Sequence, residues 1–146
     1  MYFYGTYSDD SGSHNDHDFC DSEVRPLSEF DVENLPTFAM ITPDLCNDGH
    51  DCPNATVDEW ARAHVQPILN SLTYAAGKTA VVVVYDEDHP VPNLIIAPTA
   101  RAGIDSATTG AGHAALLKTW EEMLGLPTMP TRDVAAAVSL RGPAHI

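Results

Sequence analysis

The sequence lacks any long hydrophobic run and contains few basic residues. Its longest apolar stretch, residues 79–85, has the length of a strand and is far shorter than the roughly 18 to 20 residues of a membrane-spanning helix. Lys and Arg number 7 against 21 Asp and Glu, which gives a formal net charge of −14. Proteins that bind nucleic acids need a basic surface to neutralise phosphates. We therefore expect no transmembrane segment and no nucleic-acid partner.

The chain also lacks the pattern of a signal peptide and has only three cysteines. Residues 1–5 carry no basic group, which by itself favours a cytosolic protein. Cys46 and Cys52, however, lie close enough across a short loop to form a disulfide, and such a bridge implies an oxidising compartment. A zinc site built from Cys46, His50, Cys52 and Cys20 is the alternative, although its spacing matches no common structural zinc motif.

The apolar content is sufficient for a packed core. Apolar residues make up 44% of the 146 residues and charged residues 19%, which suits one domain or part of one. Residues 1–25 are acidic and rich in turn-forming residues, so we interpret them as a polar N-terminal loop segment. Residues 26–146 are expected to hold the folded portion.

Strand and helix patterns alternate along residues 26–146. Apolar runs predict strands at residues 37–41, 79–85 and 93–97, and the second run suits a strand buried on both faces of a parallel sheet. Helical patterns lie at residues 28–34, 56–72, 113–124 and 132–140. Thr56 and Glu59 have the spacing of a capping box, and Pro67 is expected to kink or split that helix. The alternation predicts an α/β domain, in which ligand-binding groups gather beyond the carboxyl ends of the strands.

Two acidic residues follow the 79–85 run directly. Asp86 and Glu87 have no basic residue after them in sequence until Arg101. Adjacent carboxylates in this setting suit a divalent cation held by oxygen ligands. A solvated turn at the strand end is the alternative.

Two histidines are candidate catalytic residues. His50 lies next to Asp51 in a polar loop, where a neighbouring carboxylate can fix its tautomer for service as a metal ligand or general acid. His113 begins a helix after a glycine-containing loop, where an imidazole can face a pocket and the helix N-terminus attracts an anion. Taken singly, each histidine also has a plainer interpretation. His50 could be an incidental loop residue, and His113 could be a capping or surface residue.

Together these residues resemble the secreted bacterial phosphoesterase family, which includes acid phosphatases and is related to bacterial phospholipases C. The resemblance covers roughly residues 20–126 and rests on blocks that occur in the family's order, at residues 38–53, 77–88, 91–98 and 113–126. It implies an alkaline-phosphatase-like α/β fold, here a partial sandwich with a mainly parallel sheet flanked by helices. Gly49 and Ala115 depart from the pattern, because the family usually has a bulky residue and a serine there.

The resemblance also implies an activity. It suggests metal-assisted hydrolysis of phosphomonoesters, with a small-molecule phosphate ester as the partner. Asp86 and Glu87 correspond to the ligands of a divalent metal cation. His50 and His113 correspond to residues of the phosphate pocket, where they bind phosphate or protonate the leaving oxygen.

In this family the other metal ligands and the hydroxyl nucleophile lie in an N-terminal portion that has no counterpart in this sequence. We therefore interpret the chain as a C-terminal portion of an extracellular or cell-envelope enzyme, and we expect little or no turnover from it alone. Two alternatives remain, a phospholipase C-type phosphodiesterase that uses the same site and a non-catalytic acidic fragment that binds a metal or a partner chain.

Overall fold

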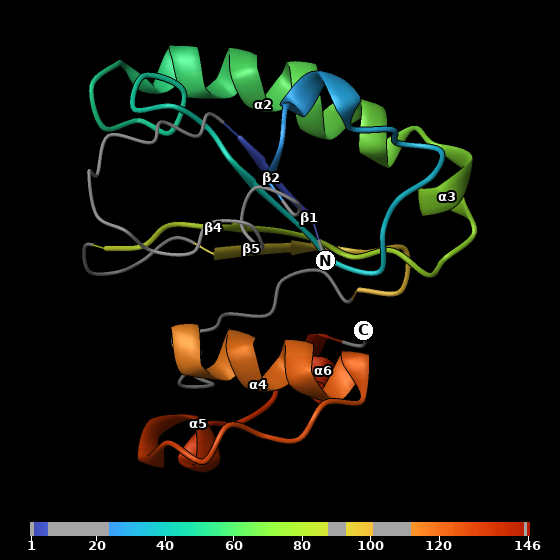
Figure 1. Cartoon of the computed structure of the whole chain (residues 1–146), viewed down its shortest axis with the longest axis vertical. Coiled ribbons are helices and arrows are strands. Elements are labelled where there is room, and N and C mark those ends of the chain that lie inside the picture. Colours follow the sequence, from blue (N-terminus) through green and yellow to red (C-terminus); the bar gives the residue numbers. More distant parts are fainter. Residues whose placement is uncertain (1, 6–23, 88–92, 101–111, 145) are drawn as a thin grey trace. The chain divides into compact units, whose positions relative to one another are not determined.

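The computed structural model describes residues 2–5, 24–87, 93–100, 112–144 and 146 (Figure 1). The chain divides into two compact units, Met1–Ala76 and Gly77–Ile146, and each is described by itself. Helices and strands alternate along the chain, which agrees with the predicted α/β class. The sandwich implied by the family resemblance stays a prediction. None of the helices in these ranges is both long and apolar enough to span a bilayer.

The first unit contains a small parallel sheet with β1 at its centre. Its strands are β1 (Tyr2–Gly5), β2 (Val24–Arg25) and β3 (Ala39–Thr42), in the order β2-β1-β3. The interpretation of residues 1–25 as loop is therefore wrong at β1 and at β2, while residues 1 and 6–23 lie outside the described residues. The aromatic run at residues 2–4 favours a strand, and the acidic, turn-rich composition that follows it obscured this signal. The proposed boundary after residue 25 stays a prediction.

Helix α2 (Asn54–Leu69) begins immediately after a proline. Pro53 is its N-cap residue, with φ −63° and an extended ψ of 154°, and no side chain caps the helix. The predicted capping box at Thr56 is wrong, because Thr56 already lies within the first helical turn. The fixed φ of a proline brings the chain to the helix entrance without a capping side chain.

The same helical region breaks after Pro67, as predicted. Helix α2 continues through Pro67 to Leu69, and the short helix α3 (Leu72–Ala75) follows. The buried Ser71 caps α3, because its side chain accepts a hydrogen bond from the Tyr74 N–H at 3.1 Å. The turn before β3 holds α3 in place: the carboxylate of Glu33 accepts a hydrogen bond from the Leu72 N–H at 3.0 Å.

The second unit contains a two-stranded antiparallel sheet. It pairs β4 (Val81–Val84) with β5 (Asn93–Ile96), in a register that runs from Val81 opposite Ile96 to Val84 opposite Asn93. The prediction of a parallel sheet is wrong for this pair. Only eight residues, 85–92, join the two strands, whereas the crossover to a parallel neighbour needs about a dozen or more.

Helix α4 (His113–Leu124) covers this sheet, and its bounds are those predicted. Ala115 and Leu116 are almost fully buried in a cluster with Leu140. Val82 and Val84 of β4 pack against that cluster, as do Ile95, Trp120 and Ala137. Because side chains alternate between the faces of a strand, these two valines turn the same face of β4 toward the helix.

Three polar side chains of α4 hold the C-terminal segment, which contains α5 (Arg132–Ala136) and α6 (Arg141–Ala144). Lys118 Nζ donates to the carbonyl of Ala137 at 2.8 Å, and Thr119 Oγ1 accepts from the N–H of Leu140 at 2.8 Å. Glu121 Oε1 accepts from the N–H of Met129 at 3.0 Å. The single helix predicted at residues 132–140 is thus shorter, because this segment bonds to α4 instead of to itself. The helical piece predicted at residues 28–34 is mostly wrong, because the short 3-10 helix η1 (Leu27–Glu29) shares only residues 28 and 29 with it.

Candidate functional site

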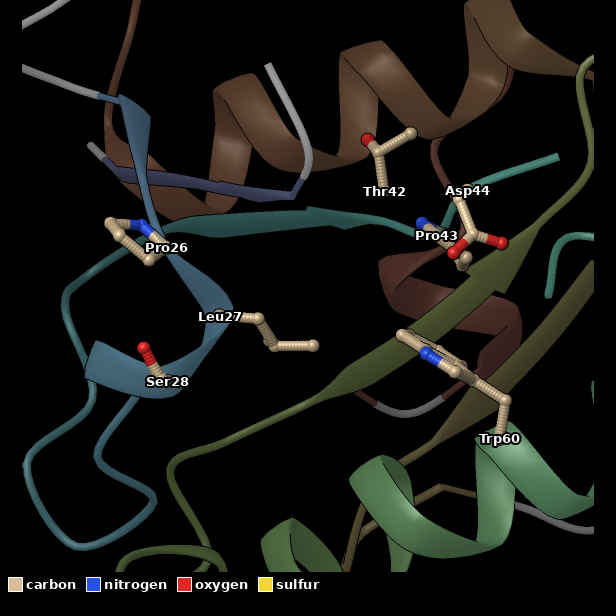
Figure 2. Close-up of a pocket in the computed structure, with 7 residues that line it drawn as sticks. All are labelled: Pro26, Leu27, Ser28, Thr42, Pro43, Asp44 and Trp60. Carbon is tan, nitrogen blue, oxygen red and sulfur yellow. The ribbon is translucent and has the colours of Figure 1, made fainter. Parts of the chain in front are cut away.

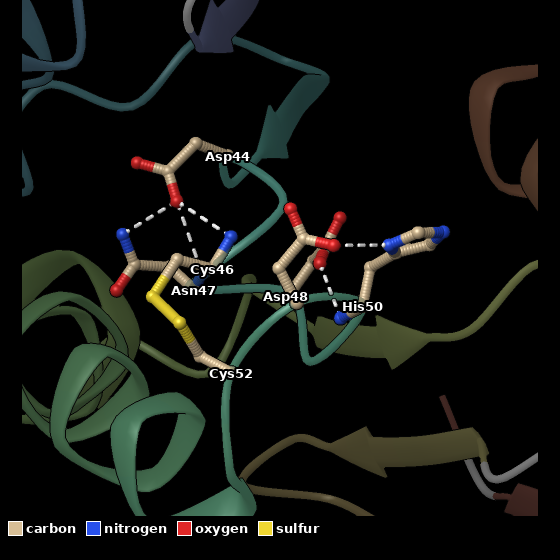
Figure 3. Close-up of a disulfide and its surroundings, with 7 residues drawn as sticks. Asp44, Cys46, Asn47, Asp48, His50 and Cys52 are labelled. Atoms are coloured by element: carbon tan, nitrogen blue, oxygen red, sulfur yellow. Dashed lines mark hydrogen bonds and ion pairs between the residues drawn. A yellow bond between two sulfur atoms is a disulfide. The ribbon is translucent and has the colours of Figure 1, made fainter.

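The loop that follows β3 is closed by a disulfide. Cys46 and Cys52 are bonded, with their Cα atoms 4.7 Å apart (Figure 3). The disulfide prediction is confirmed, and the zinc site that used both thiolates is wrong because disulfide sulfurs are not available as thiolate ligands. Cys20 lies outside the described residues.

The carboxylate of Asp44 organises the start of this loop. Its Oδ1 accepts hydrogen bonds from the N–H of Cys46 at 3.1 Å, the N–H of Asn47 at 3.0 Å and the side-chain amide of Asn47 at 2.8 Å. Asp48 makes a similar side-chain to backbone hydrogen bond, because its Oδ1 accepts from the N–H of His50 at 2.9 Å. Together with the disulfide, these local bonds fix the backbone that carries His50 (Figure 3).

The side chain of His50 pairs with the neighbouring carboxylate. Its Nδ1 lies 2.8 Å from Oδ1 of Asp51, and both side chains are more than half exposed. A carboxylate only accepts hydrogen bonds, so this contact assigns the proton to Nδ1. Nε2 is then the ring nitrogen that can accept a proton or, in the imidazolium form, give one up.

The predicted metal ligands lie at the end of β4 in the second unit. Asp86 and Glu87 are both exposed and follow the strand after Tyr85. Two carboxylates match the oxygen chemistry that divalent cations such as Mg²⁺ prefer. Within the described part of the chain, no three His, Cys, Asp or Glu side chains are grouped so that they could hold a metal ion. The pair therefore fits as part of a donor set, of the kind that water and substrate phosphate complete at magnesium sites.

Helix α4 brings His113 to the same strand end. His113 Nε2 lies 2.8 Å from the carbonyl oxygen of Tyr85, the residue before Asp86. Since a carbonyl only accepts, Nε2 carries the proton and Nδ1 is the nitrogen available for chemistry. The structure thus brings His113 to the strand end that bears the acidic pair. His50 belongs to the first unit, and its part in the same pocket stays a prediction.

The first unit also contains a hollow of about 250 Å³ that the sequence did not reveal (Figure 2). Its apolar lining consists of Pro26, Leu27, Pro43 and Trp60. Its polar lining consists of Ser28, Thr42 and Asp44. Three separate elements supply these residues, namely η1 and its flank, the end of β3, and α2. No local motif could have brought them together, although the end of a parallel strand is where a ligand is expected.

Comparisons with known proteins agree on one family. The sequence is 38% identical to a probable acid phosphatase of Kluyveromyces lactis over 71 residues, which are 46% of this chain and 17% of that protein. It is 28% identical to an acid phosphatase of Aspergillus fumigatus, over 80% of this chain and 28% of that protein. It is 30% identical to a phosphatidylinositol-3-phosphatase of Mycobacterium tuberculosis, over 70% of this chain and 36% of that protein. No solved structure matches the chain significantly.

The chain spans between 17% and 36% of the length of these relatives. The family model matches a stretch that runs from before β2 to the first residue of α4, and so includes the disulfide loop, the acidic pair and His113. That model matches residues 9–113, and the chain accordingly belongs to the Phosphoesterase family.

Proposed function

We propose that this chain contributes the cation-binding and phosphate-binding residues of a phosphatase-type hydrolase that acts on phosphomonoesters. The observation that carries the proposal is the 2.8 Å contact between His113 Nε2 and the Tyr85 carbonyl. It joins the His113 imidazole to the backbone of the residue that precedes the exposed Asp86 and Glu87, in a member of the Phosphoesterase family.

Asp86 and Glu87 are the residues that hold the cation. A divalent cation, when bound, supplies positive charge that polarises a phosphoryl oxygen. The chain has a net charge of −14, so a bound cation also offsets the repulsion that a phosphomonoester anion meets on approach to this acidic protein.

The two histidines are held through different ring nitrogens. At His113 the Nε2–H donates a hydrogen bond to the Tyr85 carbonyl, so Nδ1 accepts a hydrogen bond from the protonated oxygen of a phosphomonoester monoanion. At His50 the contact with the Asp51 carboxylate assigns a proton to Nδ1, and in the imidazolium form Nε2 donates a proton to the departing alcohol oxygen. We assign proton donation to His50 and phosphate binding to His113.

The hydroxyl nucleophile belongs to a part of the family's domain outside this sequence. The resemblance places it in the N-terminal portion of such enzymes, and the chain spans at most 36% of its compared relatives. We therefore propose that the chain binds the cation and phosphate but turns over slowly or not at all when it is alone. Groups that act as a unit in catalysis lose most of their effect when one is missing.

We further propose that the protein works outside the cytosol, in the extracellular space or the cell envelope. The disulfide between Cys46 and Cys52 supports this proposal. Disulfides persist in oxidising compartments and are rare in the cytosol.

Calorimetric titration with Mg²⁺ and inorganic phosphate tests the proposal. We expect phosphate to bind at least tenfold more tightly with Mg²⁺ present, and Asp86→Asn to remove that gain. Asp133→Asn is the matched control, because Asp133 is also an exposed acid of the second unit but belongs to α5 and not to the end of β4. Phosphate affinity that does not change when Mg²⁺ is added would contradict the proposal. An equal loss of phosphate affinity in Asp133→Asn and Asp86→Asn would also contradict it.

An aryl phosphate and the matching diester, supplied to the same protein, separate the alternatives. If the protein hydrolyses the monoester and Asp86→Asn abolishes this hydrolysis, the phosphatase activity is supported. The proposal that the nucleophile lies outside this sequence is then wrong. Preferred turnover of the diester would favour a phospholipase C-type enzyme. Cation binding without cation-linked phosphate binding would favour a non-catalytic fragment.

A further inference from the structure

The charge of the hollow in the first unit restricts what can bind there. Among the described residues that line it, Asp44 is the only charged one, and none is Lys or Arg. A phosphate dianion would meet a carboxylate there with no cation to balance it. The hollow is therefore unsuited to phosphate and suited to a positively charged group.

The volume and the apolar lining of the hollow favour a single ring. An apolar cavity of about 150 Å³ binds benzene, so a hollow of about 250 Å³ admits one aromatic ring with a short substituent. Trp60 on α2 and Leu27 on η1 supply apolar surface on two sides (Figure 2). The indole ring of Trp60 offers a stacking surface, and its face attracts cations.

The hollow adjoins the loop that carries one of the proposed catalytic residues. Asp44 lines the hollow and also begins the disulfide-closed loop, in which His50 follows six residues later. The bonds from Asp44 Oδ1 into this loop make Asp44 part of both structures. We assigned to His50 the protonation of the departing alcohol oxygen. The alcohol must therefore bind near the loop that carries His50.

We propose that this hollow binds the alcohol portion of the substrate, and that it selects an aromatic ring bearing a positively charged amine. The claim that this ligand is part of the substrate rests on the proposed function. The chemical class of the ligand follows from the residues that line the hollow. Trp60 stacks on the ring and Asp44 pairs with the ammonium group. The phosphate of the same ester lies outside the hollow.

Two phenols that differ only in charge test the ligand class. Tyramine carries an ammonium group and 4-hydroxyphenylacetate a carboxylate on the same ring. The chain has two tryptophans, so the indole N–H signals in a nitrogen-15 NMR spectrum provide an internal control. We expect tyramine to shift the Trp60 signal saturably and to leave Trp120, which packs against the core of the second unit, unchanged. The carboxylate analogue should bind at least threefold more weakly.

Asp44→Asn is the matched variant, because an asparagine keeps the side-chain oxygen that organises the loop and removes the charge. It should abolish the preference for tyramine while the Trp60 signal of the free protein stays near its original position. Equal affinity of the unaltered protein for both phenols, or equal shifts of both tryptophans, would overturn the ligand class.

The phosphate ester of tyramine tests the assignment to the substrate. We expect O-phosphotyramine to bind at least tenfold more tightly than tyramine, because the His50 imidazolium, on the loop that Asp44 begins, then contacts the phosphate ester as well. His50→Gln should remove that gain. Equal affinities would leave an amine-binding hollow with no place in the reaction and overturn the assignment. If Mg²⁺ does not tighten phosphate binding in the calorimetric experiment, the proposed function is wrong. The binding of tyramine to the hollow does not depend on that result.

Discussion

His113 Nε2 and the backbone carbonyl oxygen of Tyr85 lie 2.8 Å apart, so the first residue of helix α4 is joined to the last residue before the acidic pair. The bond fixes the imidazole tautomer as well as its position, because a carbonyl cannot donate a proton. The exposed residue His113 and the exposed residues Asp86 and Glu87 then belong to one end of the sheet.

Two substitutions separate the structural role of His113 from its chemical role. His113→Gln keeps an N–H that can reach the Tyr85 carbonyl but has no basic nitrogen, so we expect the free energy of unfolding to stay close to its original value. Mg²⁺-linked phosphate affinity should fall at least tenfold. His113→Ala loses both features and should also lower the free energy of unfolding, by about 1 kcal/mol. Urea denaturation and calorimetry check the pair, and unchanged phosphate affinity in His113→Gln would exclude the ring from the site.

The disulfide of the His50 loop should contribute modestly to stability. The bridge closes a short loop, for which the chain-entropy relation gives about 2 kcal/mol. We expect the double variant Cys46→Ser, Cys52→Ser to lower the free energy of unfolding by that amount and to broaden the NMR signals of His50. Cys20→Ser is the control, since it leaves this bridge intact. An equal loss of stability in Cys20→Ser would contradict the prediction.

Thr119 should be the most sensitive polar residue of α4. Its hydroxyl is buried, donates to the Ala115 carbonyl at 2.6 Å and accepts from the Leu140 N–H at 2.8 Å. Thr119→Val keeps the volume but leaves the Leu140 N–H without its acceptor, which should cost about 1–3 kcal/mol of unfolding free energy. Thr119→Ser retains the hydroxyl and should cost less than Thr119→Val. The reverse order in urea denaturation would show that packing, not the hydrogen bond, decides stability here.

Sequence patterns located most elements but not their pairing. The valine run of β4 and the bounds of α4 were predicted because each pattern is local and long enough to be distinctive. The direction of the neighbouring strand was not predicted, because an apolar run indicates that a strand is buried but not how it pairs. Only the short connection at residues 85–92 bears on the strand direction. At β1, three aromatic residues were too short a pattern to outweigh an acidic, turn-rich surrounding.

The candidate site was predictable to the same extent. Strand ends indicated Asp86 and Glu87, and the helix start indicated His113, but only the folded unit shows the contact of His113 with Tyr85. The hollow was missed because Leu27, Asp44 and Trp60 come from three elements. Gly49 departs from the family pattern and has φ +98°, a conformation that favours glycine, so the structure gives a physical reason for this departure.

The most direct test of the proposed site uses Mn²⁺ in place of Mg²⁺, because Mn²⁺ broadens the NMR signals of nuclei close to it. With the cation at Asp86 and Glu87, we predict that Mn²⁺ broadens the ring-proton signals of His113 and the phosphorus-31 signal of added phosphate. Asp86→Asn should remove both effects, while Asp133→Asn should remove neither. Sharp His113 signals at saturating Mn²⁺, or equal broadening in Asp86→Asn, would show that this strand end does not hold the cation.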